Sequence, residues 1–266
     1  MTWADIDKVF TLNIPIDEIL KCLFVAVRLS GLFLFGPFWS NSAIPRQLKI
    51  LLIMMTSIAV FSSIEDRLAL PPLETAGFVL AIARELIVGA AIGFVGRIVF
   101  AGFEMAGHLM GFQIGFSVAS IIDPQSRVNS SVMTIFFGLL AMLFFLSING
   151  HHWFFQSVIA SYHVIPIGQA SVSGSVVELL IKLSGRLFIW GLQLAAPVVA
   201  VLIIVDLVMG IISRAAPQMQ VLVMSFPLKS LVGVWALSAS LYFFPNAIEK
   251  LLLNLQQQII ELLQSL

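Results

Sequence analysis

Few side chains in this sequence could carry out catalysis, and they stand inside strongly apolar segments. The run GFSVA at residues 115–119 loosely matches a nucleophile elbow, the sharp turn that presents a catalytic serine. A histidine would have to act as the base, and the candidates are His108, His151 and His152. Small hydroxylated residues are common at contacts between membrane helices, where they hydrogen-bond to the backbone. We therefore expect a packing role for Ser117, and an intramembrane serine protease is the weaker interpretation.

Motifs that bind metals, nucleotides or dinucleotides are missing from the sequence. There is no HExxH zinc motif, no GxxxxGK[ST] phosphate-binding loop and no GxGxxG turn. Cys22 is the only cysteine, which excludes an internal disulfide and a cage of several cysteines around a metal. The pair His151-His152 follows Asn149-Gly150, which favours a bend near the membrane surface over a metal site. We expect no enzymatic activity, no cofactor and no bound metal.

Several charged side chains lie inside the apolar segments. An unpaired charge at the bilayer centre costs at least about 2.5–3.5 kcal/mol on insertion scales, so such groups must face protein, water or one another. Arg97 and Glu104 lie two helical turns apart and share one helix face. A proton or ion relay is the alternative, although no dense chain of Asp, Glu and His supports a pump. We expect buried structural ion pairs that involve Arg84, Glu85, Arg97, Glu104 and Asp206.

The overall composition is that of an integral membrane protein. Of the 266 residues, 59% are hydrophobic and only 11% are charged, whereas a soluble domain carries roughly 25% charged residues. The 22 phenylalanines exclude a disordered chain. A net charge of zero provides no field that would attract nucleic acid. The first residues lack the basic start of a signal peptide, so we expect the hydrophobic segments to remain in the mature protein.

About six apolar windows follow one another along the chain, separated by turns rich in proline and polar residues. Roughly 20 helical residues cross a bilayer, whereas a membrane barrel would alternate polar and apolar residues. The fold class predicted is therefore all-α. The windows cover residues 19–39, 48–64, 76–122, 130–162, 179–213 and 219–244.

Two segments do not fit simple membrane spans. As a helix, window 76–122 would be roughly 70 Å long, so it either folds back as a hairpin around its glycines or is largely buried in protein outside the lipid. Residues 246–266 are predicted to form an amphipathic helix that docks on other helices or lies at the interface. Its apolar residues step by three and four: Ile248, Leu252, Leu255, Ile259, Leu262 and Leu266.

A polar, flexible loop after residue 165 is the best candidate for a boundary between two halves of the chain. It runs from Pro166 to Ser175 and contains glycines and serines. The predicted halves are residues 1–165 and 166–266, and no sequence repeat relates them.

Glycine spacing singles out residues 107–123. Gly89 and Gly93, and then Gly107, Gly111 and Gly115, are four residues apart, which favours close helix packing. The alternative is a non-helical or broken segment, which is tolerated at membrane depth only where it is buried in protein or lines a cavity. Such a segment could plug a pore.

Several stretches, in order, resemble the FliR family, membrane subunits of the bacterial flagellar type III export gate. The resemblance covers nearly the whole chain. Virulence-secretion relatives share the architecture, but the G-x-Q-x-G-x-S segment followed by Asp-Pro is more similar to the flagellar branch. The matching stretches are GPFWSNSAIPRQLKI (36–50), GFQIGFSVASIIDPQSRVN (111–129), FFLSINGHHW (144–153), HVIPIG (163–168) and RAAPQMQVLVMSFPLK (214–229).

The resemblance implies long, bent helical hairpins that are partly raised out of the bilayer plane within a complex. It implies assembly with FliP-like and FliQ-like membrane subunits and FlhB in the bacterial inner membrane, within the flagellar basal body. Unfolded flagellar proteins would pass through the channel, driven by proton-motive force and a separate ATPase. The partners would thus be these subunits, unfolded protein and membrane lipid, but no nucleic acid.

The resemblance also assigns a pore plug to the segment at residues 107–124. Phenylalanine and isoleucine exclude water, and glycines let a segment shift between two arrangements. A secondary transporter of a small solute or ion is the alternative function, and it would require paired broken helices in two related halves. The gating residues implied are Gly111, Phe112, Gln113, Ile114, Gly115, Phe116, Ser117, Asp123 and Pro124.

Overall fold

The predicted all-α fold class is confirmed. A computed structural model describes residues 16–41, 43–64, 70, 75–116, 131–171, 174–218 and 221–266, and every regular element in them is an α-helix. The helices are α2 (Ile16–Phe35), α3 (Arg46–Ile64), α4 (Thr75–Ile114), α6 (Val132–Ser147), α7 (Gly150–Val164), α8 (Gly174–Ala215), α9 (Val221–Ser240) and α10 (Phe244–Ser265).

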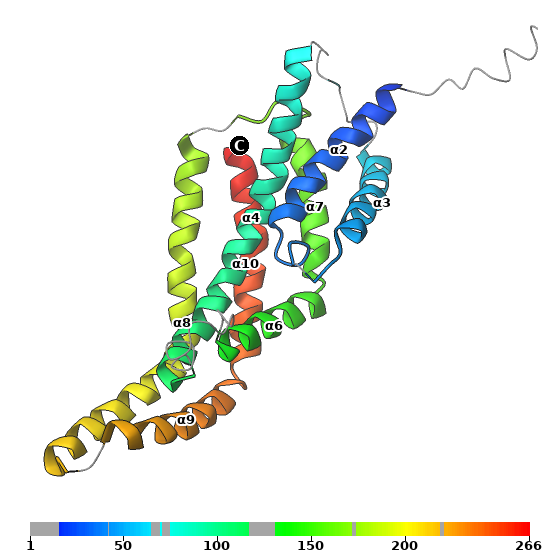
Figure 1. Cartoon of the computed structure of the whole chain (residues 1–266). Helices are drawn as coiled ribbons and strands as arrows, with labels where there is room; N and C mark the ends of the chain where they lie inside the picture. The colour runs from blue at the N-terminus through cyan, green and yellow to red at the C-terminus, as the bar shows by residue number, and fades with distance from the viewer. Residues whose placement is uncertain are drawn as a thin grey trace, which may run out of the picture.

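Helix α4 is the centre of the molecule. Figure 1 shows it running obliquely through the structure, and it packs against α2, α6, α7, α8, α9 and α10. It is a single helix of 40 residues, which corresponds to about 60 Å. Of the two alternatives for window 76–122, the hairpin around its glycines is therefore wrong for residues 75–114. Neighbouring helices cover this helix on several sides, which removes the need for a fold-back.

Close packing at the glycines of α4 is confirmed. A Cβ at Gly89 would overlap the backbone carbonyl of Arg28, and a Cβ at Gly93 would lie 2.9 Å from the Gly36 nitrogen. The backbones of α2 and α4 can approach this closely because neither position carries a side chain. Further along α4, a Cβ at Gly107 would lie 2.6 Å from the Met133 carbonyl oxygen of α6. The glycine spacing thus places α2 and α6 along the central helix.

The six apolar windows correspond to α2, α3, α4, the α6–α7 pair, α8 and α9. In the described residues, 3 helices are long and apolar enough to cross a membrane: α3, α8 and α4 over Gly77–Ile114. The pairs α6–α7 and α9–α10 are bent by 67° and 64°, and they raise the number of possible spans to 5 if each counts as one. Asn149, with φ of 56°, makes the break between α6 and α7, as the Asn149-Gly150 pair predicted.

The C-terminal helix docks on its own chain. Helix α10 runs back beside α4, as Figure 1 shows, and it also contacts α6, α7 and α8. The predicted apolar face of this helix is buried, because the first five of its six predicted residues have no exposed surface. They are Ile248, Leu252, Leu255, Ile259 and Leu262.

The long helix α8 and helix α9 each contain an internal proline, Pro197 and Pro227. A proline inside a helix lacks the N–H that would bond four residues back and clashes with that carbonyl. Figure 1 shows α8 changing direction along its length and meeting α9 in an extended hairpin. This hairpin carries the far end of α4 on its inner side.

Candidate functional site

Helix α4 ends in a turn that only glycine accommodates. Gly115 has φ of +98°, and its N–H donates to the carbonyl oxygens of Gly111 and Phe112, each at 3.2 Å. A left-handed residue just after a helix is the common way to close it, and glycine adopts that conformation without strain. A Cβ at Gly115 would also lie 2.7 Å from the Phe226 ring of α9. The predicted pore-sealing segment therefore begins as helix and leaves it at Gly115.

The end of α4 is held by α9 through apolar packing and one hydrogen bond. Ile114 is fully buried, and its side chain occupies the space above Gly233, where a Cβ would lie 2.6 Å from Ile114 Cγ1. The Ser230 hydroxyl donates to the Ile114 carbonyl oxygen at 3.4 Å. This bond satisfies one of the carbonyl groups that a helix end leaves without an intrahelical partner.

A polar contact joins the same end of α4 to α8 and α9. The Gln113 amide donates from Nε2 to Oδ2 of Asp206 at 2.9 Å. Asp206 in turn forms an ion pair with Lys229, whose side chain is 22% exposed. Asp206 was expected in a buried pair, but its side chain is 42% exposed. One carboxylate therefore links three helices at the point where α4 stops.

The remaining plug residues divide between the helix end and a part of the chain outside the described residues. Gly111 packs against Ser131, so a Cβ there would overlap the serine hydroxyl. Phe112 is 68% exposed, and Phe116 lies in the turn after α4, partly buried against the core. Residues 117–130 lie outside the described residues, and they include Ser117, Asp123 and Pro124. The gating role of all these residues stays a prediction.

Arg97 and Glu104 form the pair that their spacing predicts, but at the surface. Arg97 Nη1 lies 3.5 Å from Glu104 Oε1, and the two side chains are 47% and 39% exposed. Beside them, His108 and Thr134 line a hollow of about 370 Å³, and the Thr134 hydroxyl has no hydrogen-bond partner. This face of α4 thus carries a half-exposed ion pair beside an open, mostly apolar hollow.

Glu85 pairs with Arg28, a residue that the sequence analysis missed. Arg28 Nε donates to Glu85 Oε2 at 2.7 Å and Nη2 donates to Oε1 at 2.9 Å, so the contact is bidentate. Both side chains are fully buried. The sequence did contain a signal, because Arg28 is a charged residue in the middle of the first apolar window. Its partner, however, lies on another helix.

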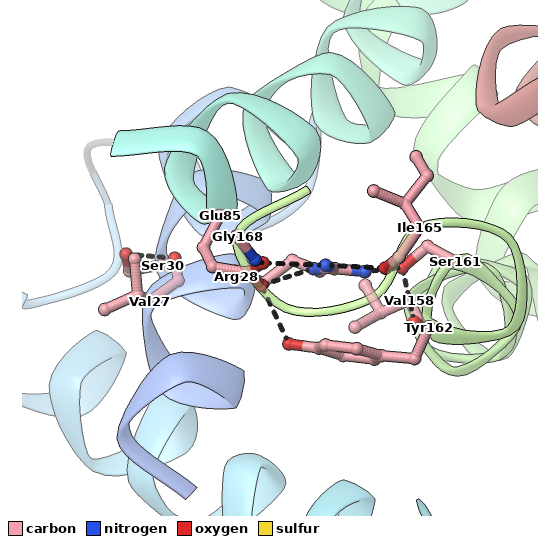
Figure 2. A network of polar contacts seen from close by, with 9 residues as sticks. All are labelled: Val27, Arg28, Ser30, Glu85, Val158, Ser161, Tyr162, Ile165 and Gly168. Atoms are coloured by element: carbon pink, nitrogen blue, oxygen red, sulfur yellow. Dashed lines mark hydrogen bonds and ion pairs between the residues drawn. The ribbon is translucent and has the colours of Figure 1, made fainter. Parts of the chain in front are cut away.

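Figure 2 shows how the Arg28–Glu85 pair is completed. The Tyr162 hydroxyl donates to Glu85 Oε2 at 3.1 Å and the Gly168 N–H donates to Oε1 at 3.0 Å. Arg28 donates to the Ser161 hydroxyl at 2.6 Å and lies over the Tyr162 ring, 3.6 Å from its centre. Two donors reach each carboxylate oxygen, so this charge is buried without an unmet hydrogen bond.

The same charges hold the loop after α7. Gly168 has φ of +71°, and its two backbone groups bind neighbouring residues of α4, the N–H to Glu85 and the carbonyl oxygen to Arg84 Nη1 at 2.7 Å. Arg28 Nη2 also donates to the Ile165 carbonyl oxygen at 3.2 Å. The loop at 166–175 was expected to be flexible, but these bonds anchor its start at Gly168. The boundary between the two halves stays a prediction.

The histidines considered for catalysis lie on different helices. His151 and His152 stack at the start of α7, with ring centres 4.2 Å apart, and His108 is on α4. In the part of the chain that the structure describes, no three His, Cys, Asp or Glu side chains gather into a metal site. Two features therefore stand out as candidate functional sites: the end of α4, which polar and apolar contacts hold in place, and the buried ionic network around Arg28 and Glu85.

These features define an all-α membrane protein whose central helix carries a fixed charge network at one end and an anchored turn at the other. The chain belongs to the family of bacterial export proteins, family 1, which matches residues 19–255. It is 32% identical to the flagellar biosynthetic protein FliR of Escherichia coli K12 over 213 residues, which cover 80% of this chain and 81% of the relative.

Two further relatives extend this comparison. The flagellar biosynthetic protein FliR of Bacillus subtilis 168 is 32% identical over 226 residues, covering 84% of this chain and 86% of the relative. The surface presentation of antigens protein SpaR of Shigella flexneri is 30% identical over 224 residues, covering 82% and 85%. The resemblance to the FliR family that the sequence stretches indicated is confirmed.

Proposed function

We propose that this chain is a subunit of the flagellar type III protein export gate of the bacterial inner membrane, within the flagellar basal body. In this role it helps to form and to seal the channel through which unfolded flagellar proteins are exported. Family membership supports the flagellar assignment, because the relatives in Escherichia coli and Bacillus subtilis are both flagellar biosynthetic proteins.

The observation that carries the sealing role is the anchored end of α4. A seal needs a firm support and a segment that can take more than one arrangement. Gln113 and Ile114 tie the helix end to α8 and α9, whereas Gly115, with φ of +98°, ends the helix in a turn. Phe112, next to this break, exposes a large apolar ring that can exclude water and ions.

Assembly with other membrane subunits is supported by surfaces that lipid alone covers poorly. The Arg97–Glu104 pair lies open on a central helix that is apolar enough to span the bilayer. Hydrocarbon is a costly environment for such charges, so protein or water must face them. We propose FliP-like and FliQ-like subunits and FlhB as the partners that cover these charged surfaces. In this proposal the chain is a conduit without catalytic activity, and the driving force comes from elsewhere.

The test compares two equally exposed phenylalanines. Phe112 and Phe243 are each 68% exposed, so a serine at either position leaves the core of the chain intact. In cells that assemble the complex, Phe112→Ser should increase membrane permeability to ions and small solutes, whereas Phe243→Ser should not. Potassium efflux and dye entry measure the difference, with the amount of assembled complex determined in parallel. Equal permeability of the two assembled variants contradicts the sealing role.

One observation favours the transporter alternative. Bent helix pairs, α6–α7 and α9–α10, occur in both predicted halves, as a transporter with two broken helices would require. The break in the second pair, however, is formed by Leu241, Tyr242 and Phe243, which offer no charged group for a solute or an ion. Saturable uptake of one solute by proteoliposomes that contain this chain alone would favour the transporter; its absence favours the export gate.

A further inference from the structure

A hollow of about 430 Å³ opens between α2 and α3, beside the turn that joins them. Its wall is mostly apolar, and two cations lie at one end. The residues that matter here are Phe33, Leu34, Ile50 and Ile53 on the wall, and Arg46 and Lys49 at the end.

The two cations have no acidic partner among the described residues. Arg46 and Lys49 lie in the first turn of α3, which contains no acidic residue, and neither takes part in the ion pairs found in the described ranges. The first N–H groups of a helix also lack intrahelical partners and add a partial positive charge. An anion at this end of the hollow would therefore meet two positive side chains and no competing carboxylate.

The position of α3 in a bilayer sets the class of anion. Helix α3 has 19 residues and passes as a membrane span, and its length of about 28 Å is close to the thickness of the hydrocarbon layer. A span of this length places its first turn near the boundary of that layer, at the level of the phospholipid phosphates. Only 17% of this span is buried inside the chain, so lipid can reach the hollow from the side.

The apolar wall continues from the cations toward the bilayer interior. Leu34 and Ile50 are each 62% exposed, while Phe33 behind them is 3% exposed and forms a firm base. An amphiphilic molecule can cover these apolar residues with its chain while its charged end contacts the two cations. A free phosphate ion would use the cations alone and leave the wall uncovered.

We propose that this hollow binds one anionic phospholipid, with its phosphate between Arg46 and Lys49 and one acyl chain along Leu34 and Ile50. Headgroups with a net negative charge are selected because a zwitterionic lipid would bring an ammonium group toward two cations. The site is independent of the sealing role proposed above. It would fix the depth of the α2–α3 hairpin in the membrane.

The test is native mass spectrometry of the full chain, or of the assembly that contains it, released from detergent. Phosphatidylglycerol and phosphatidylcholine are titrated separately. One phosphatidylglycerol should bind saturably and more tightly than phosphatidylcholine. Each cation near a membrane surface changes the affinity for an anionic lipid about fivefold. Arg46→Gln combined with Lys49→Gln should therefore weaken the binding of phosphatidylglycerol about 25-fold. Arg214→Gln, an exposed cation at the end of α8, should leave the affinity unchanged.

A second variant separates a lipid from a free anion. Leu34→Trp fills the apolar wall at an exposed position and keeps both cations, so it should weaken phosphatidylglycerol several-fold even if the charge variant fails to fold. Inorganic phosphate should not displace the lipid. Equal binding of both lipids, an equal loss in Arg214→Gln, or unchanged binding in the charge variant overturns the proposal. Displacement by phosphate, together with wild-type affinity in Leu34→Trp, shows a site for a free anion instead.

Discussion

Arg28 and Glu85, which stand 57 positions apart in the sequence, form a fully buried bidentate ion pair that joins α2 to α4. The Tyr162 hydroxyl and the Gly168 N–H also donate hydrogen bonds to the Glu85 carboxylate, so the pair fixes α7 and the loop after it. Burying two charges is favourable only with such complete hydrogen bonding. Four parts of the chain, α2, α4, α7 and the loop after α7, are therefore held at one point.

Removal of one member of this pair should be severely destabilising. Arg28→Met leaves Glu85 charged and buried, and the expected loss in free energy of unfolding is about 3–5 kcal/mol. Denaturant titration of the chain in detergent measures this loss. Arg97→Met breaks the half-exposed pair on α4 and should cost about 1 kcal/mol or less. The double variant Arg28→Met/Glu85→Met should be more stable than Arg28→Met alone. Equal losses for Arg28→Met and Arg97→Met would contradict this account.

Glycines on α4 and α8 should respond in opposite directions to the same substitution. Gly89→Ala places a methyl group on the backbone carbonyl of Arg28, so α2 must move away from α4. A loss of about 1–3 kcal/mol is expected, the usual cost of overpacking. Gly185→Ala on α8 meets no atom within 4 Å and should stabilise the helix by up to about 1 kcal/mol. Thermal unfolding of both variants in one detergent provides the comparison, and a stabilised Gly89→Ala would show that the two helices are not in close contact.

Loosening the far end of α4 should affect sealing more than stability. Lys229→Met leaves Asp206 with Gln113 only and removes the ion pair that links α9 to this polar contact. Because the pair is partly exposed, the change in free energy of unfolding should be about 1 kcal/mol or less. Ion permeability of cells that assemble the complex should rise. Lys182→Met, which removes an exposed lysine elsewhere on α8, serves as the control. If both variants leave permeability unchanged, the ion pair does not support the seal.

The docking of α10 can be tested with two leucines that are two positions apart. Leu255 has no exposed surface, whereas Leu253 is 48% exposed on the same helix. Leu255→Ala should destabilise the chain by about 2–5 kcal/mol, because it removes buried methyl groups and leaves a cavity. Leu253→Ala should change the free energy of unfolding by less than about 1 kcal/mol. Similar effects at both positions would mean that α10 does not dock through this face.

Local patterns were enough for the fold class, most helices and the buried face of α10. The step of three and four that includes Ile248 and Leu252 depends only on the helix period, and packing of the helix on the core buries that face. The packing role of Gly89 and Gly93 was also predictable from local spacing, because a helix surface without side chains allows another helix to approach closely. The FliR resemblance also rests on short stretches that can be read in order.

The sequence by itself determined that this is an all-α membrane protein, where its apolar segments lie, and that charges inside them need partners. Only the tertiary structure decided which partners these are. Helical periodicity says which residues share a face, but not which distant face it meets, so Arg28 could not be assigned to Glu85. For the same reason the structure alone shows that α4 continues unbroken to Ile114 and that Asp206 meets Gln113 and Lys229. Contacts between helices, not local preference, set these features.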